Sequence, residues 1–157
     1  MHYEGIQENG GVMDLDMYAE ELIYNYEHPK NNGSLSNADT KMREENISCG
    51  DKITVYLKIE KNKVTDVKFE GSGCVISMGT SSILTDFLKG KSVSEVESFS
   101  KQKLLELINI DPGPVRMHCA TLSLRAIKKA AFAYEKKPID WKMTFACLLP
   151  KSASYRY

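Results

Sequence analysis

Two stretches in the middle of the chain alternate apolar and polar residues with the two-residue period of a β-strand. Every second residue of "KITVYLKIE", residues 52–60, is apolar, and "KVTDVKFE", residues 63–70, repeats the alternation imperfectly. The "KNK" between them is short enough to close a hairpin, so the two strands are predicted to pair antiparallel and share one apolar face. Because two strands alone are marginally stable, a third short strand is expected around residues 36–43.

Apolar residues return at helical spacing on both sides of this region. Residues 14–29 carry an apolar stripe with acids near its start, and the pattern stops near Pro29, as expected of an amphipathic helix. The helices predicted after the strands span residues 75–90, 92–108 and 118–137. Ser92 and Ser94 are candidate N-caps of the second of these helices.

The same patterns divide the chain into one domain and two ends. Residues 1–13 contain three glycines and little periodicity, so they are predicted to form a flexible N-terminal extension. Residues 14–137 form the domain, and residues 138–157 have no clear pattern. No repeat or internal domain boundary is evident, and 157 residues suit a single domain with its own core.

Composition excludes several classes of protein. The 21 basic and 21 acidic residues give zero net charge, which removes the electrostatic footprint of a nucleic-acid-binding protein. No apolar run approaches the length of a membrane span, and the first residues lack the pattern of a secretory signal. A cytoplasmic protein is expected, in which four cysteines indicate metal binding or reactive thiols rather than a disulfide framework.

Three of the four cysteines stand at predicted element boundaries beside glycine, proline or another ligand type. Cys49 and Asp51 flank Gly50 in "CGD", where residues two apart can face the same side of a turn. Taken alone, this motif is as compatible with a buried cysteine before an ordinary Gly–Asp turn.

Cys74 follows the glycines of "FEGSGC" and precedes a predicted helix, whose dipole would favour its thiolate. His118 and Cys119 are predicted to open the last helix, after "DPGP". A small buried cysteine and a surface or capping histidine are the ordinary alternatives. No CxxC pair is present, so zinc-finger and ferredoxin patterns both fail. The coincidence of the three settings nevertheless favours a metal site over a disulfide.

The motifs of this chain are similar to those of the IscU family of iron–sulfur cluster assembly scaffolds, which includes the N-terminal domain of NifU. The resemblance runs from about Tyr18 to Lys137. The stretches that carry it are "YNYEHPKNNGSL", "CGD", "FEGSGC", "SSILTDFLKGKS" and "HCATLSLRAIKKA". It implies an α+β fold with a small antiparallel three-stranded sheet, helices packed on one side and ligand loops clustered at one end. The family's ligand set falls on Cys49, Asp51, Cys74, His118 and Cys119.

This resemblance implies a carrier protein rather than an enzyme. Such scaffolds build a [2Fe–2S] cluster from iron and from sulfur supplied by a cysteine desulfurase, and pass it to recipient apoproteins. By resemblance, Cys119 is the persulfide acceptor, and an electron donor and a homodimer are compatible partners. The chaperone-binding segment of the family is incomplete, because "DPGPVR" here keeps only Pro114 and Val115 and has Arg116 in place of lysine.

Several alternatives stay open at this point. Zinc fits the same ligands, which makes a zinc-bound sulfur acceptor for a desulfurase, similar to SufU, the closest rival. A Cys–His thiol enzyme with Cys119 as nucleophile and a purely structural zinc module are further alternatives. Three thiols leave one position of a four-ligand cluster to Asp51 or His118, and the sequence does not decide between them.

Overall fold

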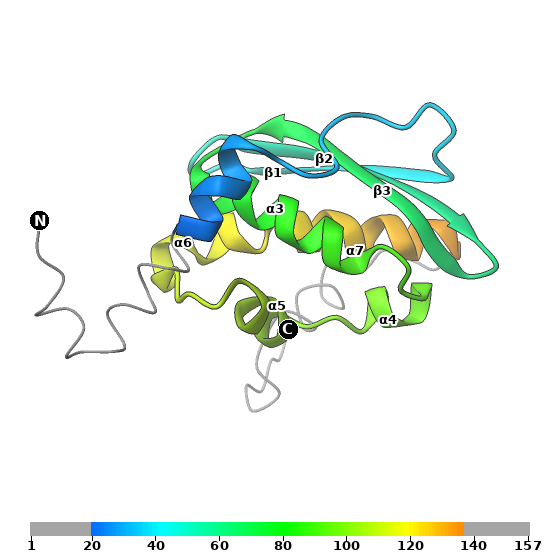
Figure 1. Ribbon diagram of the computed structural model, residues 1–157. Helices are drawn as coiled ribbons and strands as arrows, with labels where there is room; N and C mark the ends of the chain where they lie inside the picture. Colours follow the sequence, from blue (N-terminus) through cyan, green and yellow to red (C-terminus); the bar gives the residue numbers. More distant parts are fainter. Residues whose placement is uncertain (1–19, 137–157) are drawn as a thin grey trace, which may run out of the picture.

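The computed structural model describes residues 20–136, in which a three-stranded antiparallel sheet is covered on one face by helices (Figure 1). The strands are β1 (Thr40–Asn46), β2 (Asp51–Glu60) and β3 (Lys63–Ser72), in that spatial order. The helices are α3 (Val75–Leu88), α4 (Val93–Glu97), α5 (Lys101–Ile108), α6 (Gly113–Ala120) and α7 (Leu122–Tyr134). The expected α+β class and sheet are confirmed.

The β2–β3 hairpin forms as the alternation predicts. Lys61 and Asn62 both adopt positive φ, 53° and 62°, which is the backbone of the two-residue turn that suits the twist of paired strands. The register shifts at Lys58/Ile59, so Ile59 pairs with Val64 while Lys58 pairs with Asp66. This β-bulge explains the imperfect alternation of the second strand, because one extra residue there keeps both flanking valines on the buried face.

The third strand exists but begins later than predicted, at Thr40 instead of residue 36. Asp39 ends the preceding loop: its backbone N–H donates to the Leu57 carbonyl at 2.8 Å, and its side chain accepts from the Ile59 N–H at 2.7 Å. The carboxylate therefore takes the place of a backbone carbonyl at this edge of β2. Accordingly, the pKa of Asp39 is lowered, chiefly by the hydrogen bond from Ile59.

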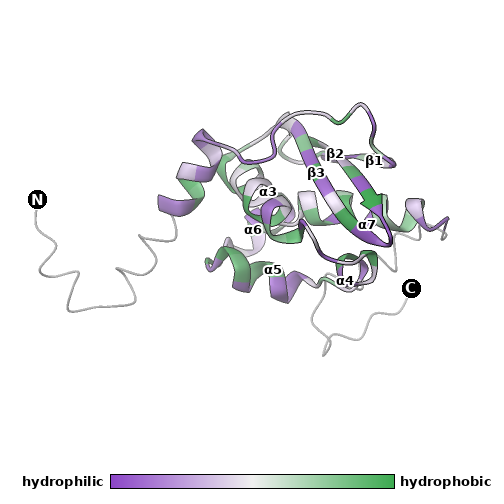
Figure 2. Ribbon diagram, turned by 45° about the vertical axis from the view of Figure 1, so that its right-hand side comes forward, coloured by the Kyte–Doolittle hydropathy of each residue, from purple (hydrophilic) through white to green (hydrophobic). Residues whose placement is uncertain are grey.

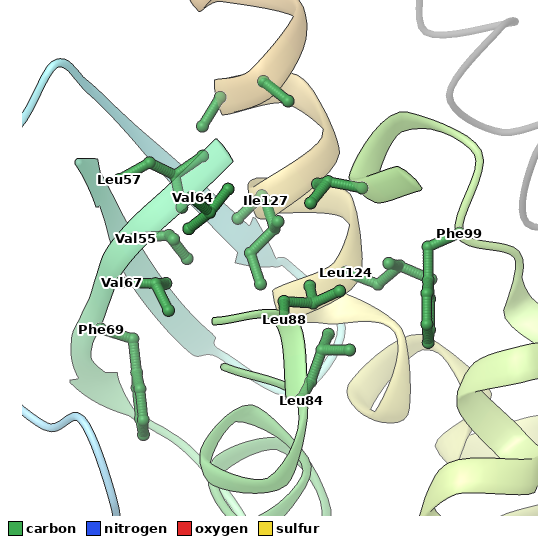
Figure 3. Packing of buried hydrophobic residues seen from close by; sticks show 14 of the residues in the cluster. Val55, Leu57, Val64, Val67, Phe69, Leu84, Leu88, Phe99, Leu124 and Ile127 are labelled. Carbon is green, nitrogen blue, oxygen red and sulfur yellow. The ribbon is translucent and has the colours of Figure 1, made fainter. Parts of the chain in front are cut away.

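Helices α3 and α7 lie against the apolar face of the sheet, and α4 and α5 lie on their far side (Figures 1 and 2). Figure 3 shows the side chains of the strands meeting those of the helices in one core. Labelled members are Val55, Leu57, Val64, Val67, Phe69, Leu84, Leu88, Phe99, Leu124 and Ile127. The predicted helix 75–90 is confirmed with its end at Leu88.

Two of the predicted helices are each divided in the structure. The helix predicted over 92–108 becomes α4 and α5, because Phe99 turns into the core and Ser100 caps a new helix by accepting from the Lys103 N–H. The predicted cap at Ser92 is confirmed, and Glu95 completes a capping box with it.

The sequence prediction placed the start of the next helix too late, at residue 118. Helix α6 already begins at Gly113, with Pro114 in its first turn, where a proline is tolerated. The Thr121 hydroxyl donates to the Met117 carbonyl at 3.0 Å, and the chain changes direction there before α7. His118 and Cys119 therefore lie near the C-terminal end of a helix and not at an N-terminus, which corrects the prediction.

The amphipathic helix predicted over 14–29 is seen over residues 20–27. Residues 14–19, together with the predicted extension 1–13 and the tail 138–157, lie outside the described residues. Between residues 20 and 136, no helix is long and apolar enough to cross a bilayer.

The helical stretch 20–27 packs tightly on α3 at Gly79. A Cβ atom on Gly79 would lie 2.6 Å from the Leu22 carbonyl oxygen and 2.9 Å from a methyl carbon of the same residue. Both contacts are shorter than side-chain packing allows, so the two helices approach this closely only because residue 79 has no side chain.

We therefore expect Gly79→Ala to destabilise the protein although alanine is the better helix former. The gain in helix propensity is about 1 kcal/mol, whereas overpacking a close contact costs about 1–3 kcal/mol, and here the contact is with backbone. Urea unfolding should show a lowered midpoint, with Gln102→Ala on the exposed side of α5 as the control. An unchanged or raised midpoint would mean that the stretch 20–27 moves away at no cost.

Candidate metal centre

Three connecting segments bring potential metal ligands to one end of the sheet. Cys49 lies in the loop between β1 and β2, and Asp51 is the first residue of β2. Cys74 is the N-cap of α3, directly after β3, and Cys119 lies in the last turn of α6. In Figure 1, α6 and the start of α3 lie at the same end of the molecule. The fold thus brings together cysteines that are 25 and 45 residues apart in the sequence.

The ligand atoms are close enough to share an ion or a cluster. One ligand atom each from Cys49, Asp51 and Cys119 lies within 4.8 Å of the others. The sulfurs of Cys49 and Cys119 are 3.4 Å apart, and the Cys74 sulfur is 3.5 Å from Oδ2 of Asp51. All three thiols are free. The arrangement therefore gathers three sulfurs and one carboxylate, the mixed soft and hard donor set that the sequence suggested.

His118 is the one predicted ligand whose ring lies outside this group. Its side chain is exposed, and its carbonyl accepts from the Arg125 guanidinium at 3.2 Å. Adjacent residues on a helix point about 100° apart, so the buried position of Cys119 directs His118 toward solvent. A role for His118 as a ligand stays a prediction, in which its ring would have to turn toward the thiols.

Burial controls the protonation of Cys119. Its side chain is 4% exposed, and burial, with the contact to Cys49 and the nearby Cys74, raises its pKa to about 12. A position at a helix N-terminus beside His118, as the sequence suggested, would favour a lowered pKa; burial raises it instead, and the helix end beside Cys119 is a C-terminal one. Metal binding to this thiol must therefore release a proton.

Asp51 carries the negative charge of the site. Burial by itself would raise the pKa of this carboxyl, but hydrogen bonds from Ser77, Cys49, Cys74 and Cys119 together lower it below its usual value. Asp51 is therefore a carboxylate at neutral pH, held by the same thiols that would be its fellow ligands.

Two supporting residues were not found from the sequence. The Asn46 side chain places Nδ2 3.7 Å from the Cys119 sulfur and Oδ1 3.2 Å from the Ser48 N–H, while its carbonyl accepts from the Gly50 N–H at 2.7 Å. Asn46 therefore orders the loop that carries Cys49, and Gly50 closes that loop with a φ of 78°. The signal was available, because asparagine favours such side-chain-to-backbone turns.

Ser77 is the second supporting residue. Its hydroxyl donates to the Cys74 carbonyl at 3.2 Å, lies 3.8 Å from the Cys74 sulfur and contributes to holding Asp51 ionised. It lies in the first turn of α3, three residues after the N-cap. A serine in a helix has many ordinary roles, so the sequence alone did not distinguish this one.

Burial and protonation predict different reactivities for the two neighbouring thiols. In the metal-free protein, iodoacetamide should modify exposed Cys49 several-fold faster than Cys119 at neutral pH, because the thiolate is the nucleophile. Mass spectrometry of quenched samples measures each site, and urea-unfolded protein provides the control in which the difference should vanish. Equal rates in the folded protein would contradict the buried, protonated state of Cys119.

Comparisons with known sequences all point to the same protein family. The sequence profile of the family "NifU-like N terminal domain" matches residues 17–140. The iron–sulfur cluster assembly scaffold protein IscU of Buchnera aphidicola subsp. Acyrthosiphon pisum is 34% identical over 127 residues, covering 78% of this chain and 98% of that protein. An IscU scaffold protein of Archaeoglobus fulgidus is 31% identical over 121 residues, covering 77% and 78%. A relative in Drosophila melanogaster, 32% identical, is named an assembly enzyme instead.

Solved structures agree with these relatives. The crystal structure of a SUF-system protein from Fervidobacterium islandicum has a TM-score of 0.63 at 26% identity, over 73% of this chain and 97% of that one. The N-terminal part of a NifU-like protein from Brucella abortus has a TM-score of 0.66 over 80% and 99%, and its 20% identity supports the fold alone. The chain therefore belongs to the NifU-like N terminal domain family.

Proposed function

We propose that this protein is a scaffold on which a [2Fe–2S] cluster is assembled and from which it is passed to recipient apoproteins. The observation that carries the proposal is the convergence of three free thiols and one carboxylate, from three separate segments of the chain, at one end of the sheet. Stable clusters are usually held by four thiolates. A site with three thiols and a weaker fourth ligand suits a cargo that must later leave.

The exposed surroundings of the site support exchange with partners. Ile47, beside Cys49, is 94% exposed, and Val115, in the first turns of α6, is 85% exposed. Large apolar side chains at such exposure next to a ligand site are suited to partner contact. We assign to this rim the docking of a cysteine desulfurase and of recipient proteins, in the cytoplasm. A chaperone, an electron donor and a second copy of the chain are further candidate partners.

Sulfur delivery requires a nucleophilic thiolate at the site. In the proposed step, Cys119 attacks the outer sulfur of a desulfurase persulfide, so that one S–S bond forms, another breaks and the desulfurase thiolate leaves. Two electrons from a donor then reduce the transferred sulfur to sulfide. Because Cys119 is buried and protonated in the metal-free protein, this role requires the Cys49 loop to open or a metal ion to displace the proton.

The function is tested by anaerobic reconstitution with iron and sulfide. We expect an oxygen-sensitive visible chromophore with the Mössbauer signature of a [2Fe–2S] cluster, which a chelator removes and an apo-ferredoxin accepts. Metal analysis of the same samples addresses the second candidate, a zinc-bound sulfur acceptor, which three sulfurs and one oxygen would also suit as a tetrahedral set. Tightly bound zinc, without a chromophore under any reducing condition, would favour that second function.

The persulfide acceptor is a separate prediction. With a partner desulfurase and cysteine, mass spectrometry of trapped thiols should find the added sulfur on Cys119, and Cys119→Ser should remove it. Cys49→Ser is the matched variant, because its sulfur lies only 3.4 Å away. Persulfide found only on Cys49 in the unsubstituted protein would show that this exposed thiol, and not Cys119, is the acceptor.

A further inference from the structure

A groove lies between the C-terminal end of α3 and helices α4 and α5, and it has no part in the metal centre. Its volume is about 470 Å³. The rings of Phe87 and Phe99 stand 5.7 Å apart at its base, and Leu107 lines it from α5. Because Cys74 caps the N-terminus of α3 and the helix ends at Leu88, the groove and the metal ligands lie toward opposite ends of that helix.

The groove is lined by apolar side chains and bordered by charges of both signs. Phe87 is 42% exposed, although it is a large aromatic residue, and the Lys91 ammonium lies 4.8 Å from the centre of its ring. Glu95, Lys103 and Glu106 complete the border. An apolar floor with a mixed-charge rim fits an apolar segment of chain with few charges of its own better than an acidic or basic ligand.

The chain itself supplies a segment of that chemistry after the last described residue. Although the tail as a whole has no clear pattern, its stretch "WKMTFACLL", residues 141–149, has apolar residues at alternate positions from Trp141 to Phe145 and is apolar from Phe145 onward. An extended segment with this pattern presents one apolar side. Lys142 is its only charged residue.

The tether is short enough to bring this segment to the groove. The Lys128 ammonium of α7 donates to the Phe99 carbonyl at 2.6 Å, so the floor of the groove lies beside the middle of α7. Six residues of helical rise, roughly 9 Å, separate Lys128 from the end of α7 at Tyr134, and Lys136 follows two residues later. The five residues from Lys136 to Trp141 span up to about 17 Å when extended, which is enough for Trp141 to return to Phe99.

Covalent attachment favours this occupant over a separate molecule. A segment tethered by a few residues has an effective concentration in the millimolar range. A second copy of the chain or another protein must compete against that concentration for the same apolar surface. Moreover, α4 packs against α7, and Figure 1 shows α4 and the end of α7 at the same end of the molecule.

We propose that residues 141–149 of the same chain dock in the groove between α3, α4 and α5, with Trp141 as the anchor against the aromatic floor. The docked segment covers Phe87 and closes the helical layer on the side away from the sheet. It also removes Cys147 from solvent, so this fourth thiol does not compete with Cys49, Cys74 and Cys119 for metal.

The chain offers a direct probe, because Trp141 is its single tryptophan. In the full-length, metal-free protein we expect Trp141 emission to be blue-shifted, and acrylamide quenching to be several-fold weaker than in urea-unfolded protein. Phe87→Asp, a change at a half-exposed position, should shift the emission toward the unfolded value. Tyr24→Asp, at an exposed position on the helical stretch 20–27, is the matched control and should leave it unchanged.

A second variant tests the proposal without altering the described fold. Trp141→Ser should speed alkylation of Cys147 several-fold, as followed by mass spectrometry, while the rates at Cys49 and Cys119 stay the same. Emission of Trp141 that equals the unfolded value, or that is insensitive to Phe87→Asp in a protein with unchanged circular dichroism, would overturn the proposal. Protection of Trp141 that depends on protein concentration would also overturn it, because a second copy would then fill the groove.

Discussion

Serine in place of Cys49, Cys74 or Cys119 is expected to abolish the visible absorption of the reconstituted protein, whereas Cys147→Ser leaves it intact. Within residues 20–136 the site gathers three thiols, and iron–sulfur clusters are held mainly by cysteine thiolates. Changing only an outer-shell partner of a metal ligand costs about 10–100-fold in metal affinity. Loss of a direct ligand from a set that is already short of thiolates should therefore reduce the amount of retained cluster by at least the same factor.

The measurement is anaerobic reconstitution followed by visible and Mössbauer spectroscopy on protein of equal concentration. Each variant needs a thermal melt in the metal-free state, because Cys119 is a core residue and Cys49 is not. Serine is close in size to cysteine, so the melts should change little. Unaltered spectra in Cys74→Ser would remove Cys74 from the ligand set and leave Cys49, Asp51 and Cys119 as the site.

The sheet could be predicted from the sequence because its signal is local. Alternation over residues 52–70 and a two-residue turn determine the hairpin, and only the bulge near Thr65 disturbs the pattern. The start of β1 was predicted less well, since the limit of that strand depends on the bond from Ile59 to the Asp39 side chain. That bond joins residues 20 apart, and no local pattern reports it.

Helix boundaries were predicted less accurately, and the error affected the chemistry. "DPGP" suggested a break, yet Pro114 lies in the first turn of α6, so Cys119 occupies the opposite end of a helix from the one expected. The N-terminal dipole that would lower the pKa of this thiol is therefore missing, and burial raises the pKa instead. Four of the five proposed ligands nevertheless converge, because each stands where a strand or helix begins or ends, and these ends meet at one side of the sheet.

The local turn at Asn46 had a signal in the sequence, but the contacts that join the supporting residues to the ligands could not be predicted, because they are tertiary. Asn46 reaches Cys119 across 73 positions of sequence, and Ser77 supports Asp51 from a different element. Neither residue belongs to a ligand motif. Both residues form hydrogen bonds with buried polar groups of the site. The partners of these bonds are evident only from the folded arrangement of the loops.

Asp51→Ala is expected to assemble a cluster, to keep it several-fold longer under a chelator and to transfer it more slowly to an apo-ferredoxin. The Asp51 side chain is 5% exposed, yet it is ionised and lies within ligand distance of the thiols. Its hard oxygen matches iron in transit better than a finished cluster with soft sulfur ligands. Such a ligand, or a water that it holds near iron, is easily exchanged and should therefore speed release of the cluster.

A purely structural role for Asp51 predicts the opposite result. The carboxylate accepts hydrogen bonds from Ser77 and the surrounding thiols, so it also joins the loop after β1 to the start of α3. If that were its whole contribution, alanine would lower the melting temperature and shorten cluster lifetime together. Asp51→Asn separates the two roles, because the amide keeps an acceptor oxygen and the side-chain volume but lacks the charge. Slow cluster loss in both variants, with a melt restored by asparagine, supports the labile ligand; faster loss in both would contradict it.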